Sequence, residues 1–299
     1  MESLLHPLTA RQLHQATVAP AGAYLFHGGT SHGKATAARE LARQLNCTAA
    51  CEPDALVLCA NCVVFRAGNH PHFAVVTLQD KASIGIEQIR QLHGDLSLKA
   101  YAGSGQRVVV IDGAELLTTE AQNALLKLIE EPPPSTVLIL TATDLERLLP
   151  TVRSRCQAVF FPPLANEAIA GYLVRHDGAS GVLAAEIAAL AAGAIGLARR
   201  LASDETELET YRRLDALGRE LLEATTFERL VAARQLAEAK APLTILVQRL
   251  QACLQAALRE GASDGRLQAQ RLQAVARFWR RTEANVSPRV ALESLLLEV

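Results

Sequence analysis

Apolar positions in the first half of the chain follow two spacings. Short runs made almost wholly of apolar residues predict strands buried on both faces, and apolar residues every three or four positions predict amphipathic helices. The predicted strands cover residues 24–26, 73–78, 108–111, 137–141 and 157–161. Because helical segments separate these strands, we expect a parallel sheet with helices on both faces.

Three of the predicted helices lie between these strands. One begins at Lys34, one covers residues 86–96, and one begins at Thr119. Gln122 follows Thr119 at the spacing of a capping box, which indicates the start of that helix. The prolines at 132–134 forbid its continuation.

The strand pattern stops after residue 163. Residues 165–201 are rich in alanine and helical in spacing, with glycines that break the segment. From about residue 205 the chain reads as successive amphipathic helices, with a loop expected at 261–265. We therefore predict three domains, at residues 1–162, 163–204 and 205–299.

Composition narrows the class of protein. Of the 299 residues, 49% are hydrophobic and 20% charged, which favours a folded protein over a disordered one. The net charge of -1 excludes a polycation, so any contact with nucleic acid has to come from a local patch or a larger assembly. Residues 1–8 do not resemble a signal peptide, and no apolar window is long enough for a membrane span. We expect a cytoplasmic protein, in which the six cysteines bind metal or are buried.

Residues 28–35 fit the phosphate-loop pattern G-x-x-x-x-G-K except at the last position. Gly28 and Gly33 let backbone N–H groups converge on a phosphate, and Lys34 can reach its terminal oxygens. The hydroxyl residue that ligates Mg²⁺ is replaced by Ala35, and Thr36 comes one residue too late to share its direction. A glycine-rich turn that binds nothing is the alternative.

Asp112 comes at the C-terminal end of the β-branched run at 108–111, where its carboxylate could hold a Mg²⁺ ion through water. The alternative is a cap for the next helix. Hydrolysis needs a base or a water-positioning group, commonly a Glu directly after this Asp. Gly113 stands there instead, and Glu115 is the next acid along the chain.

Cysteines are clustered in one segment. Cys47, Cys51, Cys59 and Cys62 form the pattern C-x3-C-x7-C-x2-C. Four thiolates suit tetrahedral Zn²⁺, and a fully occupied ligand set indicates a structural site, at residues 47–62, rather than a catalytic one. Buried free thiols are the alternative.

Ser154-Arg155-Cys156 comes just before the last predicted strand. An arginine there can cap a helix or face solvent, and it can also act as an arginine finger in the ATP site of another subunit. Spacing alone leaves this choice open.

Longer stretches make the chain similar to a known family. It resembles the delta-prime subunits of the bacterial DNA polymerase III clamp loader and, more distantly, the tau/gamma motor subunits. The matching stretches are the phosphate loop, the cysteine cluster, 68–71, 123–133, 141–144, 154–156 and 285–293. The segments Leu-Leu-Lys-x-x-Glu-Glu-Pro and Ser-Arg-Cys are the most specific of them.

The resemblance implies an α/β P-loop AAA+ core, a small helical lid and an all-α C-terminal collar domain in a five-subunit ring. It implies that Arg155, with Ser154 and Cys156, reaches the ATP site of a neighbouring motor subunit. The implied partners are tau/gamma and delta, with the sliding clamp and primer–template DNA reached through the assembly. Zinc is also a family feature, although Leu56 stands where the family usually has a cysteine.

Three positions separate the delta-prime type from the motor type. The motor needs a Mg²⁺-binding hydroxyl, a catalytic Glu and a lid arginine, and this chain has Ala35, Gly113 and Gly196. We therefore expect a chain that is not an enzyme on its own, although Lys34 could still support static ATP or ADP binding. The alternatives are an active motor that uses Thr36 and Glu115, and a stand-alone nucleotide switch.

Overall fold

The computed structural model describes residues 5–51, 57–79, 82–98, 105–238, 242–259, 265–283 and 286–299. By their contacts the residues form two compact units, residues 1–172 with 193–197 and residues 173–192 with 198–299. The three-domain division at residues 163 and 205 stays a prediction. Leu56 and most of the loop predicted at 261–265 lie outside the described residues.

A five-stranded parallel sheet organises the first unit, in the order β2-β3-β4-β1-β5. Its strands are β1 (Ala23–Gly28), β2 (Phe73–Val76), β3 (Arg107–Ile111), β4 (Thr136–Ala142) and β5 (Gln157–Phe161). The predicted parallel sheet is therefore confirmed. The strand predicted at 73–78 is shorter than expected.

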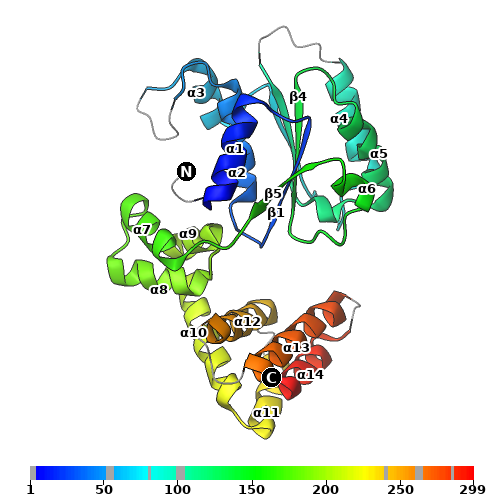
Figure 1. Cartoon of the computed structure of the whole chain (residues 1–299). Helices are drawn as coiled ribbons and strands as arrows, with labels where there is room; N and C mark the ends of the chain where they lie inside the picture. The colour runs from blue at the N-terminus through cyan, green and yellow to red at the C-terminus, as the bar shows by residue number, and fades with distance from the viewer. Residues whose placement is uncertain are drawn as a thin grey trace. The chain divides into compact units, whose positions relative to one another are not determined.

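Helices cover both faces of this sheet (Figure 1). The helices of the first unit are α1 (Pro7–Val18), α2 (Lys34–Asn46), α3 (Ala60–Arg66), α4 (Ile86–Leu98), α5 (Thr119–Glu130) and α6 (Pro150–Arg153). Alternate residues of each central strand point to opposite faces. On β1, Leu25 packs in the core beneath α4 and α5, whereas Phe26 packs in the core beneath α1 and α2.

Helix α1 was not predicted, and it protects an edge of the sheet. Strand β5 is an edge strand, and the outer backbone groups of an uncovered edge strand can pair with another chain. Thr9 Oγ1 donates to the carbonyl of Phe160 at 2.7 Å, and Gln12 Nε2 donates to that of Ala158 at 3.4 Å. Side chains of α1 thus use acceptors that a further strand would need.

The start of α5 corrects the predicted capping box. The cap is Thr118, whose Oγ1 accepts from the backbone N–H of Ala121 at 3.2 Å. The buried amide of Gln122 instead donates to the carbonyls of Leu117 and Arg147, and it accepts from Leu149 N at 2.7 Å. Sequence spacing missed these partners because two of them come from a loop about 25 residues further on.

The helices after β5 are α7 (Asn166–His176), α8 (Gly181–Ala191), α9 (Ile195–Ser203), α10 (Glu205–Glu223), α11 (Thr226–Glu238), α12 (Leu243–Arg259), α13 (Gly265–Glu283) and α14 (Pro288–Glu298). In the second unit, apolar faces of α10, α12, α13 and α14 share one core. A buried ion pair joins two of these helices, because Arg249 Nε lies 2.8 Å from Asp215 Oδ1. Arg249 also donates to the carbonyl of Leu190 at the end of α8.

None of the described helices is both long and apolar enough to cross a membrane.

Candidate functional site

The glycine loop between β1 and α2 has the backbone of a phosphate loop. At Gly28, φ is 149°, and a Cβ atom would lie 2.3 Å from the carbonyl oxygen of Phe161 on the neighbouring strand. Only glycine fits so close an approach. Gly33, with φ at 88°, is the N-cap of α2, so the helix begins at Lys34.

The Lys34 side chain is turned back onto its own loop. Its Nζ donates to the carbonyls of Gly28 and Gly29 at 2.9 and 2.6 Å, and the residue is buried. Burial lowers the pKa of Lys34, while the nearby carboxylates of Glu115 and Asp112 act in the opposite direction. To bind the Lys34 ammonium group, a phosphate would have to displace these two carbonyls as its hydrogen-bond partners.

A cavity of about 280 Å³ lies beside this loop. It is lined by residues 30–36, 112, 113, 115, 141–143 and 196. Asp112 points its Oδ1 at Thr141, whose hydroxyl donates to it at 2.6 Å. The sequence-predicted residues Gly33, Lys34 and Asp112 are thus brought together around one cavity.

Gly113 and Glu115 line this cavity next to Asp112. Gly113 has φ at 80° and ψ at 54°, a left-handed conformation that a glutamate would adopt only with strain. Glu115 is turned toward β4, where one carboxylate oxygen accepts from the backbone N–H of Thr143 at 3.2 Å and from its hydroxyl. Its other oxygen is buried without a hydrogen-bond partner in the structure.

Gly196, at the start of α9, packs directly on the phosphate loop. Its N–H donates to the carbonyl of Ser31 at 2.9 Å, and a Cβ atom would lie only 3.1 Å from the same oxygen. Any larger residue at 196 therefore requires the loop to move.

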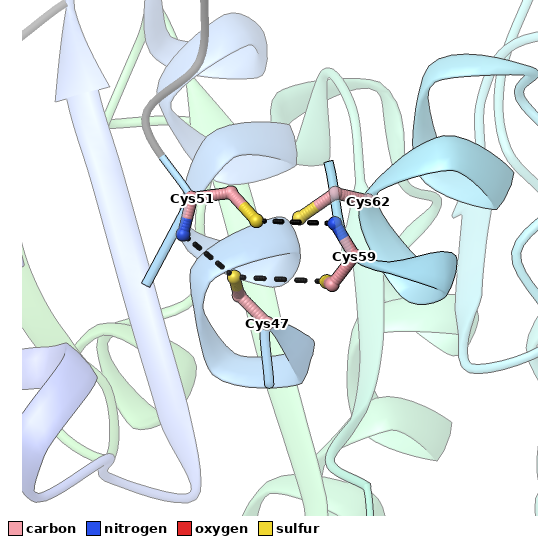
Figure 2. A group of neighbouring side chains, drawn as sticks. All are labelled: Cys47, Cys51, Cys59 and Cys62. Atoms are coloured by element: carbon pink, nitrogen blue, oxygen red, sulfur yellow. Dashed lines mark hydrogen bonds between the residues drawn. The ribbon is translucent and has the colours of Figure 1, made fainter. Parts of the chain in front are cut away.

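The four clustered cysteines come together as predicted (Figure 2). Their sulfur atoms all lie within 4.8 Å of one another, and the Sγ atoms of Cys47 and Cys59 are 3.9 Å apart. Thiolates bound to Zn²⁺ at about 2.3 Å in a tetrahedron are about 3.8 Å apart. The four side chains therefore fit a zinc ion with little movement.

Hydrogen bonds to sulfur favour the thiolate form at part of this cluster. The backbone N–H of Cys51 donates to Cys47 Sγ and that of Cys59 donates to Cys51 Sγ, both at 3.2 Å. Backbone N–H groups of Cys62 and Thr48 lower the pKa of Cys59 to about 5. Burial raises the pKa of Cys62 to about 12, although a hydrogen bond from Arg43 opposes this shift.

Sequence reasoning missed Arg43 as a neighbour of the cluster. The arginine lies on α2 one helical turn before Cys47, and its Nη1 is 3.0 Å from Cys62 Sγ. The spacing of Arg43 and Cys47 gave a signal, since residues four apart lie on the same side of a helix.

Arg155 and Lys34 lie at opposite ends of the strands: Arg155 is at the edge formed by the amino ends of the strands, and Lys34 is at the edge formed by their carboxyl ends. In the pairing of β1 with β5, Tyr24 is opposite Gln157 and Gly28 is opposite Phe161. Arg155 precedes Gln157 and so lies at the amino edge, whereas Lys34 follows Gly28 at the carboxyl edge. The two cations are therefore separated by the length of β1, in which each residue adds about 3.3 Å.

At the amino edge, Arg155 forms an ion pair with Glu130, the last residue of α5. Its Nη1 also donates to the carbonyl of Thr151 at 3.3 Å. Arg155, Ser154, Cys156 and Glu130 line an open hollow of about 510 Å³. Arg155 and Ser154 are exposed, so another molecule that approaches this hollow would compete with Glu130 for the guanidinium.

Comparisons with known proteins identify relatives of the sheet-bearing part. The model of the family described as "DNA polymerase III, delta subunit" matches residues 5–165. The DNA polymerase III subunit gamma/tau of Mycobacterium tuberculosis is 35% identical over 159 residues, which are 52% of this chain and 27% of that protein. The DNA polymerase III subunit delta' of Bacillus subtilis is 38% identical over 156 residues, 52% of this chain and 46% of that protein. The matches thus span less than half the length of these curated relatives.

Structural similarity extends over nearly the whole chain. A crystal structure of a DNA polymerase III gamma subunit-related protein from Thermotoga maritima matches with a TM-score of 0.50 and 19% identity. The match covers 95% of this chain and 97% of that one. At this identity the match concerns the fold alone, and it confirms the predicted α/β core followed by helical segments.

Proposed function

Because the chain belongs to the family described as "DNA polymerase III, delta subunit", we propose that it is a subunit of the clamp loader of DNA polymerase III. In this proposal it has the delta-prime role: it does not hydrolyse ATP itself, and it supplies Arg155 to the ATP site of a neighbouring tau/gamma subunit. The delta subunit is a further partner. The sliding clamp and primer–template DNA are reached through the assembly.

The observation that carries this proposal is the position of Arg155. The guanidinium is exposed at the amino edge of the sheet, whereas the phosphate loop of the same chain is at the carboxyl edge. A phosphoryl group that Arg155 stabilises therefore has to be held by another molecule. An arginine finger acts in this way and contributes about 10³–10⁵ in rate.

The cavity beside Lys34 supports the non-hydrolysing part of the proposal. Ala35 has no hydroxyl for Mg²⁺, and Gly113 has no carboxylate to orient water. Gly196 leaves no side chain where a lid arginine would contact the γ-phosphate. With metal coordination and water activation both missing, we expect Lys34 to support at most static ATP or ADP binding.

The proposed finger is tested in the clamp loader reconstituted from purified subunits. We expect Arg155→Ala to slow ATP hydrolysis at the adjacent motor site by about 10³-fold or more, measured in single-turnover experiments with clamp and primer–template DNA. Arg153→Ala, two residues earlier on α6, is the matched control and should leave the rate unchanged. Equal rates for Arg155→Ala and the unsubstituted assembly would contradict the finger.

One observation favours the alternative of an active motor. Glu115 is the acidic residue besides Asp112 that lines the cavity, and a general base is the group that Gly113 does not supply. ATP turnover by the isolated chain, abolished by both Lys34→Ala and Glu115→Gln, would establish this alternative. We expect the isolated chain to show no such turnover.

A further inference from the structure

A guanidinium from outside the cysteine segment contacts the proposed zinc site. Arg43 Nη1 donates to Cys62 Sγ at 3.0 Å. The Arg43 side chain is 11% exposed and Cys62 is 1% exposed, so the contact is largely withdrawn from water. Helix α2 carries Arg43 and is followed directly by Cys47, so one rigid element positions both the cation and a candidate ligand.

Glu40 orients this guanidinium. Its two carboxylate oxygens accept from Nε and Nη2 of Arg43 at 2.8 and 2.6 Å. Gln44 Nε2 donates to the same carboxylate at 2.9 Å. Because the planar fork of the arginine faces Glu40 along one edge, the remaining Nη1 is directed at the sulfur.

Four thiolates and one Zn²⁺ ion carry a net charge of -2, which is costly to hold away from water without hydrogen-bond donors. We propose that Arg43, oriented by Glu40, donates a hydrogen bond to the Cys62 thiolate in the zinc-bound state and thereby tightens zinc binding. This inference rests on the proposed zinc site. Residues that support metal ligands in this way change affinity by about 10–100-fold when they are replaced.

A simpler interpretation is that Arg43 and Glu40 form an ordinary ion pair within one helix. The two interpretations differ in one measurable quantity, because a pair that only stabilises the helix has no effect on the dissociation constant for Zn²⁺. The sulfur contact predicts that removing the donor weakens zinc binding.

The experiment measures the Zn²⁺ dissociation constant of the full chain by competition with a chromophoric chelator. Arg43→Met keeps the aliphatic stem and removes both the charge and the donor, and we expect affinity to fall by about 10–100-fold. Arg39→Met is the matched control: Arg39 lies one turn earlier on α2, over the ring of Phe73 at 5.5 Å, and its loss should leave affinity unchanged. The Co²⁺-substituted variants should keep the thiolate-to-metal absorption, because all four ligands remain.

Equal affinities for Arg43→Met and the unsubstituted chain would overturn the inference and leave the zinc site standing. If the unsubstituted chain binds no Zn²⁺, the zinc site and the inference both fall. Should Arg43→Met fail to fold, Glu40→Gln decides: weaker binding by about tenfold supports the role of Arg43, and unchanged binding overturns it.

Discussion

Gln122 shows how a single buried amide can join distant backbone segments. Both ends of its side chain are used: the nitrogen donates to two carbonyls, and the oxygen accepts from Leu149 N. These contacts hold the loop before α6, the helix that precedes Arg155, against the start of α5. Replacement by an apolar residue of similar size leaves buried backbone groups without partners.

We expect Gln122→Leu to lower the free energy of unfolding by about 1–3 kcal/mol, measured by urea denaturation. Gln91→Leu, at an exposed position of α4, is the control and should change stability by less than about 0.5 kcal/mol. A loss no larger than that of the control would mean that the network contributes no net stability.

The left-handed conformation of Gly113 leads to a second prediction for a single residue. Because its φ is 80°, placing a glutamate there imposes a left-handed conformation on a residue with a Cβ atom. We expect Gly113→Glu to cost about 1–2 kcal/mol of stability and to produce no ATP turnover. ATP turnover gained by this change alone would contradict the proposal that Ala35 and Gly196 also prevent hydrolysis.

At the scale of elements, α2 connects the two chemically distinctive parts of the first unit. It begins at Lys34, at the end of the phosphate loop, and Cys47 is its C-cap. A metal ion at the cysteines would therefore anchor the far end of the helix on which the phosphate loop depends, by linking it to Cys62 on α3.

Removing zinc should therefore destabilise the core. With free Zn²⁺ at 100 times its dissociation constant, binding adds about 2.7 kcal/mol of stability, which a chelator removes. We expect a lower thermal midpoint after chelation, measured by circular dichroism. Cys62→Ser should abolish the effect of the chelator, whereas Cys253→Ser, in α12, should retain it. A midpoint that chelation does not change would contradict a structural metal.

Sequence patterns predicted the elements in which the buried residues follow a regular spacing. Strand β3 is a continuous apolar run because helices cover both its faces, and the spacing of α2 follows from its single buried face. Helix α1 was missed because its buried residues are Thr9, Leu13 and Ala16, of which one is polar and one is small, so no strong apolar stripe marks the helix. The contact of Gly196 with Ser31 depends on how distant segments pack, and no local pattern encodes it. The place of Arg43 beside the cysteine cluster, by contrast, could have been found from its spacing to Cys47.

At the scale of the whole molecule, the chain carries a net charge of -1. Contacts with phosphates need clustered cations, so this balance gives the isolated chain little general attraction for DNA. We expect fluorescence anisotropy to show binding of primer–template DNA by the isolated chain no tighter than a dissociation constant of about 10⁻⁵ M at 150 mM salt. Nanomolar binding by the chain alone would contradict a role for the assembly in DNA contact.

The separation of Lys34 and Arg155 across one sheet also bears on stoichiometry. Subunits that each offer an arginine at one edge and an active ATP site at the other could join head to tail without limit, unless the rotation closes a ring. A subunit that offers the arginine but has no working site of its own occupies a terminal place in such a series. The proposed function therefore implies one copy of this chain per assembly, at the end of the row of motors.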